Sequence, residues 1–283
     1  AVIAVGSSTW WNYRHQADGC HAYHVLRTAG IPADHIIVMM QDDIANNEEN
    51  PIPGTLFNRP GANSPNVYDG CMIDYRGDVV TKELFLQVIT GNASAGGPVL
   101  QSGPEDRVFL NFVDHGGVGI VAFPNGPLMT VSELSDGLAT MKQKGLYGEL
   151  VFYMEACESG SMFPNPPSKV FALTAANADE SSWATYCTNN TVNGIAVGTC
   201  LGDLFSVSWM EYCDLLGTTP KTIQDQVAEV TQRTSKSHVE TFGDTSLEQL
   251  PACSYASAGA MTLRQMESDD DTAMMVRNVP LKM

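Results

Sequence analysis

The residues best suited to chemistry are one histidine and one cysteine, each placed just after an apolar stretch of strand length. His115 follows the stretch 107–113, and Cys157 follows the stretch 150–154. A cysteine becomes a nucleophile when a neighbouring base takes its proton and backbone N–H groups stabilise the oxyanion formed on the substrate. Gly116-Gly117 directly after the histidine lets the backbone approach a substrate closely. Either residue alone is more often a packed structural side chain, but together they favour acyl transfer by a thiol.

The two residues must be positioned by the elements that precede them. Apolar stretches typical of strands alternate with segments of helical period, and a parallel sheet brings the carboxyl ends of its strands to one edge, where ligands bind. We expect strands at 2–5, 35–40, 107–113, 150–154 and 170–174, and helices at 16–28, 81–90, 130–144, 203–216 and 221–236. A third polar run, 12–15, is expected at a strand end on the same edge. The prediction is one α/β domain, a mostly parallel sheet with helices on both faces.

Composition excludes several classes of partner. The chain has 283 residues, of which 43% are hydrophobic, and its formal net charge is −17. So acidic a chain is a poor match for nucleic acid, whose binding depends on lysine and arginine, and for an anionic membrane surface. We find no apolar run near the ~18 residues of a membrane span. The acidity suits a protein of an acidic compartment, where protonation reduces the repulsion between carboxylates.

The cysteines bear on metal binding and on compartment. There are seven, an odd number, so at least one is unpaired within the chain. They form no Cys-x-x-Cys pair, and no histidine stands at zinc-finger spacing from them, so we expect no structural metal and no cofactor. A nucleophilic Cys157 must stay free, and the pairing of the other six is left open. Two sequons, Asn92-Ala93-Ser94 and Asn189-Asn190-Thr191, are weak signs of a secreted glycoprotein.

Three blocks in the right order carry a family resemblance. The blocks 12–18 (Asn-Tyr-Arg-His-Gln-Ala-Asp), 114–116 (Asp-His-Gly) and 155–161 (Glu-Ala-Cys-Glu-Ser-Gly-Ser) resemble the legumain (asparaginyl endopeptidase) family of caspase-like cysteine proteases. The similarity extends from residue 1 to about residue 245. It implies a caspase-like α/β fold, with a catalytic domain over 1–263. Residues 264–283 would be a C-terminal tail or the remnant of an activation peptide, as in a zymogen.

The resemblance also implies the reaction and the residues that perform it. It predicts hydrolysis of peptide bonds after Asn, and after Asp at acidic pH, through an acyl-enzyme on Cys157. The predicted catalytic residues are Cys157, His115, Asn12, which orients the histidine, and Gly116, whose N–H joins that of Cys157 in an oxyanion hole. The predicted specificity pocket comprises Arg14, His15, Glu155, Ser181, Ser182 and Asp203. Such a pocket suits an Asn amide, because arginine donates to its carbonyl while carboxylates accept from its NH₂ group.

Other functions share parts of this pattern. A transpeptidase, a peptide ligase or a GPI-transamidase-like enzyme would use the same acyl-enzyme with an amine acceptor. An inactive caspase-like binding module would lack the nucleophile or the base, and both are present. A nucleotide-binding α/β protein is disfavoured, because residues 6–10 match neither Gly-x-Gly-x-x-Gly nor the Walker pattern. By resemblance, the expected partners are peptides or proteins with an exposed Asn and cystatin-type inhibitors. The expected location is a lysosome- or vacuole-like compartment or the cell exterior.

Overall fold

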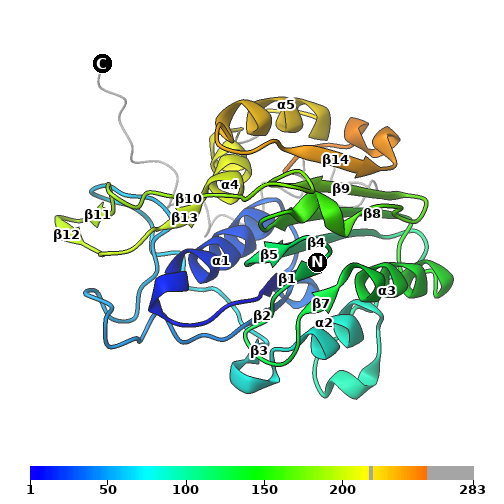
Figure 1. Cartoon of the computed structure of the whole chain (residues 1–283), viewed down its shortest axis with the longest axis horizontal. Helices are drawn as coiled ribbons and strands as arrows, with labels where there is room; N and C mark the ends of the chain where they lie inside the picture. Colours follow the sequence, from blue (N-terminus) through cyan, green and yellow to red (C-terminus); the bar gives the residue numbers. More distant parts are fainter. Residues whose placement is uncertain (217–218, 254–283) are drawn as a thin grey trace, which may run out of the picture.

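The computed structural model describes residues 1–216 and 219–253, which form a central sheet covered by helices (Figure 1). The sheet has seven strands in the order β14-β9-β8-β4-β1-β2-β3. Their bounds are β1 (Val2–Val5), β2 (Ile37–Met40), β3 (Tyr75–Arg76), β4 (Arg107–Val113), β8 (Glu149–Glu155), β9 (Val170–Thr174) and β14 (Glu240–Gly243). Neighbouring strands are parallel except for β14, which runs antiparallel to β9. The predicted fold class is confirmed.

Among the described residues, five α-helices cover the two faces of the sheet. They are α1 (Tyr13–Thr28), α2 (Lys82–Ile89), α3 (Val131–Gln143), α4 (Leu204–Leu216) and α5 (Ile223–Arg233). Side chains of α1, α4 and α5 share one apolar cluster, and those of α2 and α3 share another with the opposite strand face. Because both faces are covered, β1, β2 and β9 are buried at every position, which explains their unbroken apolar sequences. Threonine side chains cap α2, α3 and α5 at Thr81, Thr130 and Thr222.

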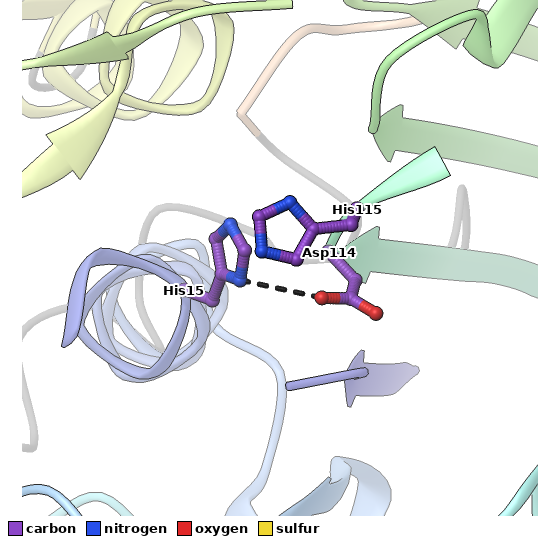
Figure 2. Close-up of side chains that lie close together, drawn as sticks. All are labelled: His15, Asp114 and His115. Atoms are coloured by element: carbon purple, nitrogen blue, oxygen red, sulfur yellow. Dashed lines mark ion pairs between the residues drawn. The ribbon is translucent and has the colours of Figure 1, made fainter. Parts of the chain in front are cut away.

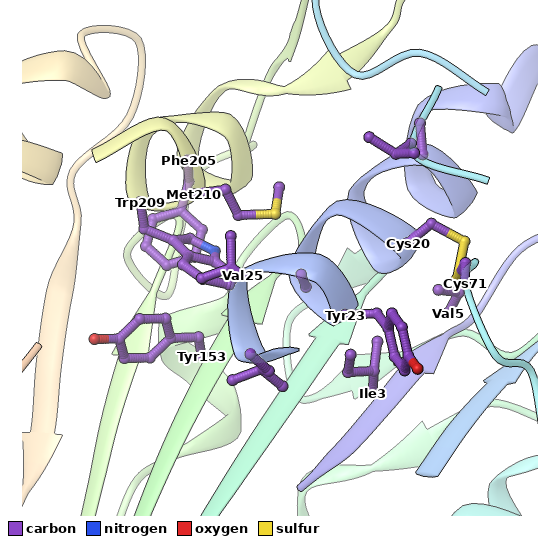
Figure 3. Close-up of a cluster of buried hydrophobic side chains, with 14 of the residues drawn as sticks. Ile3, Val5, Cys20, Tyr23, Val25, Cys71, Tyr153, Phe205, Trp209 and Met210 are labelled. Atoms are coloured by element: carbon purple, nitrogen blue, oxygen red, sulfur yellow. A yellow bond between two sulfur atoms is a disulfide. The ribbon is translucent and has the colours of Figure 1, made fainter. Parts of the chain in front are cut away.

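Large aromatic side chains fix α4 against the middle of the sheet. Tyr153 of β8 packs edge-to-face on Trp209 of α4, with ring centroids 5.5 Å apart, and on Phe109 of β4 at 5.2 Å. Figure 3 shows Tyr153, Phe205 and Trp209 within this cluster. Each such side chain buries about 150–250 Å² of surface. This packing holds β4 and β8 rigid, and these two strands carry the histidine and the cysteine.

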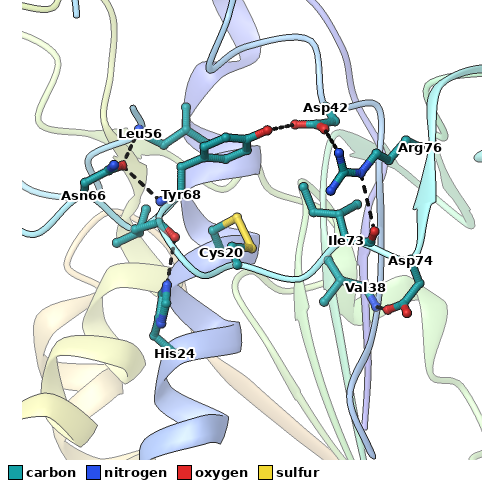
Figure 4. Close-up of a disulfide and its surroundings, with 12 residues drawn as sticks. Cys20, His24, Val38, Asp42, Leu56, Asn66, Tyr68, Ile73, Asp74 and Arg76 are labelled. Carbon is teal, nitrogen blue, oxygen red and sulfur yellow. Dashed lines mark hydrogen bonds and ion pairs between the residues drawn. A yellow bond between two sulfur atoms is a disulfide. The ribbon is translucent and has the colours of Figure 1, made fainter. Parts of the chain in front are cut away.

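Three disulfides fix loops around the sheet: Cys20–Cys71, Cys187–Cys200 and Cys213–Cys253. Cys157 is the free cysteine among the described residues. Figure 4 shows Cys20–Cys71, which ties the middle of α1 to the long irregular segment 41–74. Tyr68 of that segment also donates a hydrogen bond to Asp42 at 2.9 Å. The pairing that the sequence left open thus anchors α1, whose first turn enters the candidate site.

The structure differs from the predicted elements in a few places. The second strand begins at Ile37 rather than 35, because a 3-10 turn, Ala33–His35, follows Pro32. The first helix begins at Tyr13 rather than 16, so the run 12–15 opens a helix and does not end a strand. That expectation was wrong because β1 ends at Val5 and residues 6–12 carry the chain to the helix. Strand β14 was not predicted, and residues 264–283 lie outside the described part of the chain.

Candidate active site

The register of two central strands brings His115 and Cys157 to the same edge of the sheet. Val113 of β4 pairs with Glu155 of β8, and His115 and Cys157 each lie two residues beyond this pair. The backbone N–H of Asp114 extends the pairing by donating to the carbonyl of Glu155 at 3.0 Å. A Cβ atom at position 116 would clash with the carbonyl oxygen of Cys157, so only glycine allows the two loops to lie this close. The predicted convergence of the two strand ends is therefore found.

Asn12 fixes the orientation of the His115 ring. The Asn12 side chain donates from Nδ2 to the carbonyl of Ser8 at 2.8 Å, which leaves Oδ1 as the acceptor facing the histidine. His115 Nε2 lies 2.8 Å from that oxygen and must therefore carry a proton. In the neutral ring the lone pair is then on Nδ1, which is free to act as a base. The orienting contact predicted for Asn12 is present.

The loops after β4 and β8 offer backbone donors next to the cysteine. Strand β5 (Gly116–Gly117) pairs with β6 (Ile120–Val121), and β6 with β7 (Met129–Thr130). Ala122 N–H donates to the His115 carbonyl at 3.1 Å, which makes Gly116 and Val121 a non-hydrogen-bonded pair. The Gly116 N–H therefore lies outside this ladder. On the other side of the site, Cys157 Sγ lies 3.8 Å from the carbonyl oxygen of Ser182.

A mostly buried charged cluster adjoins the cysteine. Arg14, in the first turn of α1, donates from Nε to Asp203 Oδ1 at 2.8 Å and from Nη1 to the Trp11 carbonyl at 3.0 Å. Asp203 lies in β13 (Gly202–Asp203), which pairs with β10 (Ala184–Thr185). His15, the next residue of the helix, places Nε2 3.3 Å from Asp203 Oδ2. Both α1 and β13 thus contribute to one pocket.

Four carboxyl oxygens in this cluster are buried without a hydrogen-bond partner among the described residues, namely both of Asp114, Glu155 Oε1 and Asp203 Oδ2. Glu155 accepts from the N–H and the hydroxyl of Ser206 through Oε2, both at 3.0 Å, while its Oε1 has no partner among the described residues. Asp203 Oδ2 is likewise unpartnered within the described part of the chain, because the nearby His15 lies outside hydrogen-bond geometry. Buried acceptors of this kind are costly unless a ligand supplies the donor. They are therefore positions at which a bound donor group would relieve an unfavourable burial.

Burial shifts the titration of the acids and the histidine in the pocket. Burial, and then the charge of Asp203, raise the pKa of Glu155 to about 8. Burial also raises the pKa of Asp114 to about 7. Burial lowers the pKa of His15 to about 3, despite the opposing effect of Asp203. At mildly acidic pH these three groups are therefore neutral, and the Arg14–Asp203 ion pair dominates the pocket.

One group of side chains has the spacing of a metal site. Figure 2 shows His15, Asp114 and His115, whose potential ligand atoms lie within 4.8 Å of one another. Two of its nitrogens already have partners inside the protein. His15 Nδ1 is hydrogen bonded to Ser7 Oγ at 2.6 Å, and His115 Nε2 to Asn12. A cation here would have to compete with the contacts that orient His115, so we assign the group to packing and proton transfer.

Comparison with known proteins identifies the family. The Peptidase C13 family profile matches residues 1–258. The chain belongs to the Peptidase C13 family. Its relatives in that family include mouse (Mus musculus) legumain, which is 46% identical over 90% of this chain and 58% of the relative. Schistosoma mansoni hemoglobinase is 43% identical over 99% of this chain and 65% of its own length. The Citrus sinensis vacuolar-processing enzyme is 44% identical over 88% of this chain and 53% of its own length.

This member of the Peptidase C13 family also shares its fold with a solved caspase. Caspase-1 from Spodoptera frugiperda superposes with a TM-score of 0.52 over 86% of this chain and 84% of that structure, at 12% identity. This likeness confirms the caspase-like fold and nothing beyond it. The chain spans about 58% of the length of mouse legumain. Within the described part of the chain, each helix is either too short or too polar to cross a bilayer.

Most residues predicted for the C13 site lie together, and the structure adds others. Ser182 adjoins Cys157 and Glu155, whereas Ser181 is exposed and makes no hydrogen bond to the cluster within the described residues. Sequence reasoning did not assign Asp18 or Ser206, although both contact pocket residues. Asp18 ends the first motif block, so its position in the chain offered a signal. Ser206 offered none, because its hydroxyl meets Glu155 only after α4 has packed.

Proposed function

We propose that the chain is a cysteine endopeptidase that hydrolyses peptide bonds after Asn, and after Asp at acidic pH. One observation carries this proposal: the Arg14–Asp203 pair and the Glu155 and Asp203 oxygens, unpartnered in the described structure, belong to a cluster that reaches both reactive residues. Its His15 ring packs on His115 at 4.9 Å between centroids, and its Glu155 lies two residues before the free Cys157. An Asn side chain offers one acceptor and two donor hydrogens, which complement one guanidinium and two carboxyl groups. A residue without that amide would leave the buried groups unpaired, which costs about 1–3 kcal/mol per group.

In the proposed mechanism, His115 moves the protons and Cys157 forms the covalent bond. His115 Nδ1 takes the thiol proton, and the thiolate attacks the carbonyl carbon of the Asn residue. The N–H groups of Gly116 and Cys157 stabilise the tetrahedral oxyanion. The C–N bond then breaks, the amine leaves with the proton from His115, and a thioester remains. Water attacks the thioester, with His115 again as base, and the thiol regains its proton as the acid product departs.

Acceptance of Asp at acidic pH is proposed from the electrostatics of the pocket. An ionised Asp would face the carboxylate of Asp203 and, at neutral pH, an increasingly charged Glu155. A protonated Asp carries one O–H donor and one carbonyl acceptor, so it resembles Asn. Because the pKa of Glu155 lies at about 8, this glutamic acid adds little repulsion at mildly acidic pH. The preference for Asn over Asp should therefore fall as the pH is lowered.

We also propose where the enzyme meets its substrates. Peptides and proteins with an exposed Asn in an acidic lysosome- or vacuole-like compartment, or outside the cell, would present the required bond. The net charge of −17 supports this setting, because its self-repulsion falls as carboxylates become protonated. Cystatin-type inhibitors that offer an Asn-containing loop to the same pocket are the expected protein partners.

A fluorogenic peptide assay tests the proposal. Peptides that carry Asn, Asp or Ala before the reporter are incubated at pH 5.5 and 7 with the wild type and with Cys157→Ala. We expect release after Asn at both pH values, release after Asp mainly at pH 5.5, and no release from the variant. Release that persists in Cys157→Ala, or the absence of release after Asn, would refute the proposal. An added amine separates the alternatives, because amine adducts as the main product would indicate a ligase instead.

A further inference from the structure

A chain of mostly buried polar contacts runs along one face of α1 to the proposed specificity pocket. It starts at Asp18, which is fully buried one helical turn after Arg14. Asp18 Oδ2 accepts from the backbone N–H of Asp203 at 3.1 Å, and Asp18 Oδ1 accepts from Asn58 Nδ2 at 2.6 Å. Asp18 therefore holds the backbone of the residue whose side chain pairs with Arg14.

The orientation of Asn58 is fixed by its two acceptors. Asn58 Nδ2 donates to Asp18 and to the carbonyl of Leu201 at 2.9 Å, so Oδ1 must accept. His21 Nδ1 lies 2.7 Å from that oxygen and carries a proton. His21 Nε2 lies 3.1 Å from Asp214 Oδ2, a carboxylate oxygen that can only accept. The polar contacts thus lead from the partly exposed Asp214 through His21, Asn58 and Asp18 to the backbone of Asp203.

Close packing at Gly202 restrains the Asp18 and Asn58 side chains. A Cβ atom at Gly202 would lie 2.9 Å from Asn58 Nδ2 and 3.2 Å from Asp18 Oδ1, so the side chains press against bare backbone. Leu201, Gly202 and Asp203 are consecutive, and two of them accept from or donate to Asn58 and Asp18. The Asp18–Asn58 pair therefore fixes the segment that enters β13. A change at Asp18 would first displace the backbone of Asp203.

We propose that Asp18 is a positioning residue for substrate specificity: by fixing the Asp203 backbone, it sets the Arg14–Asp203 pair at the geometry that reads an Asn amide. This assignment rests on the proposed function, because it takes Arg14 and Asp203 to bind substrate. Asp18 itself is buried beneath the pocket and does not touch the reacting atoms. Its effect should therefore appear in recognition of the Asn side chain and not in the chemistry at Cys157.

The test compares Asp18→Asn with a matched control. In Asp18→Asn the new NH₂ group must face one of two donors, the Asp203 N–H or Asn58 Nδ2. Loss of a hydrogen bond to the buried Asp18 carboxyl group predicts a KM for the Asn peptide about 10- to 100-fold higher, with kcat within about threefold. Asp74→Asn is the control, because Asp74 likewise accepts a backbone N–H, that of Val38 at 2.9 Å, outside the pocket. Its KM should equal that of the wild type.

A second readout separates positioning from general loss of structure. Iodoacetamide alkylates Cys157 without using the pocket, so its rate should be unchanged in Asp18→Asn. A peptide electrophile with an Asn side chain should label the variant about 10-fold or more slowly. If Asp18→Asn does not fold, Asp214→Ala is tested instead, because Asp214 is the solvent-exposed end of the chain of contacts that leads to Asp18. A KM for the Asn peptide raised about two- to fivefold supports the positioning role of Asp18, and an unchanged KM overturns it.

The two proposals fail in different ways. If the wild type does not cleave after Asn, the proposed function is wrong and the assignment of Asp18 is wrong with it. If the wild type cleaves after Asn and folded Asp18→Asn has an unchanged KM, only the assignment of Asp18 is overturned. A loss of iodoacetamide labelling equal to the loss of labelling by the Asn electrophile would also overturn it, because the role would then be merely structural.

Discussion

The proposed nucleophile with its base and the proposed specificity pocket meet where His15 packs on His115, but they are built differently. His115 is exposed and Cys157 is half-buried, and each follows a neighbouring strand of the sheet at the same register. The pocket residues Asp203 and Glu155 are buried and come from separate elements. The strand pairing alone brings the first pair together. The pocket forms only when α1, β8 and β13 have all packed.

This difference indicates how the work is divided. A nucleophile and a base need access to the substrate backbone, which every peptide shares, and an exposed sheet edge provides it. Selection of one side chain needs polar groups that are costly to leave unpaired, and burial provides that cost. The shifted pKa values follow the same division: those of Glu155, Asp114 and His15 are all moved first by burial.

The largest expected effect comes from a change in the His115–Cys157 pair. Cys157→Ala should lower peptide hydrolysis by at least about 10³-fold, because no acyl-enzyme can form. The half-buried thiol supports little packing, so the free energy of unfolding should change by less than about 1 kcal/mol. Peptide turnover and thermal melting measure the two effects. A variant that loses activity by unfolding would contradict the separation of chemistry from stability.

A change in the pocket should instead affect both selectivity and stability. Arg14→Gln should lower kcat/KM for Asn peptides by about 100-fold, through loss of a charge-assisted hydrogen bond. It should also destabilise the fold by about 3 kcal/mol, because Asp203 keeps a buried charge without its partner. Steady-state kinetics and urea unfolding in the Cys157→Ala background measure these effects. Arg14→Gln with unchanged Asn kinetics would remove Arg14 from the pocket.

The buried acids predict that stability falls as the pH rises. The folded-state pKa values of Asp114 and Glu155 are raised to about 7 and about 8. Their stabilising contribution is complete below their unfolded pKa values near 4 and is lost as the pH rises through the raised values. His15 acts oppositely: its pKa is lowered to about 3, so its contribution is lost as the pH falls below about 6.5. The two acids outweigh one histidine.

Thermal melts of Cys157→Ala between pH 5 and 8 check this balance without self-digestion. The free energy of unfolding should fall by about 2–4 kcal/mol over this range. Glu155→Gln removes the acid whose pKa is raised to about 8 while the opposing His15 remains, so it should flatten most of the slope. A flat or rising profile in the parent would contradict the burial assigned to these carboxyl groups.

The smallest expected effect is that of a helix cap at the end of the small sheet β5-β6-β7. Thr130 caps α3 by accepting from the Glu133 N–H at 3.3 Å, while Glu133 accepts from the Thr130 N–H at 2.8 Å. Thr130→Ala should cost about 1 kcal/mol of stability. Its kcat/KM for Asn peptides should match that of the wild type. An altered KM would show that the cap of α3 is coupled to substrate binding at the edge of the sheet.

The sequence predicts the sheet and the exposed pair better than the pocket. Continuous apolar strands such as 107–113 and 150–154 are legible because both of their faces are buried, and residues just past them share one edge. Strand β14 was not predicted, because Glu240–Gly243 is short, half-buried and only partly apolar. Its pairing with β9 depends on a long-range contact that local pattern does not encode.

The pocket residues can be named from a family resemblance, but their spacing along the chain does not predict that they meet. Arg14 and Asp203 are 189 residues apart, and nothing local to either announces the ion pair. Asp18 and Asn58 meet only because α1 and the segment 41–74 are packed and joined by Cys20–Cys71. Such buried polar contacts are set by tertiary structure, which explains why sequence reasoning missed Asp18 as a contact of Asp203.

The most direct test of the account is labelling of Cys157 by peptide electrophiles that differ in one side chain. Intact mass is recorded at pH 5.5 after reaction with matched Asn, Asp and Ala probes, and the labelled residue is mapped. We expect one adduct, on Cys157, whose rate of formation is highest with the Asn probe, lower with the Asp probe and lowest with the Ala probe. We expect no adduct in Cys157→Ala. Equal labelling by all three probes, or an adduct on another residue, would contradict the pairing of this nucleophile with this pocket.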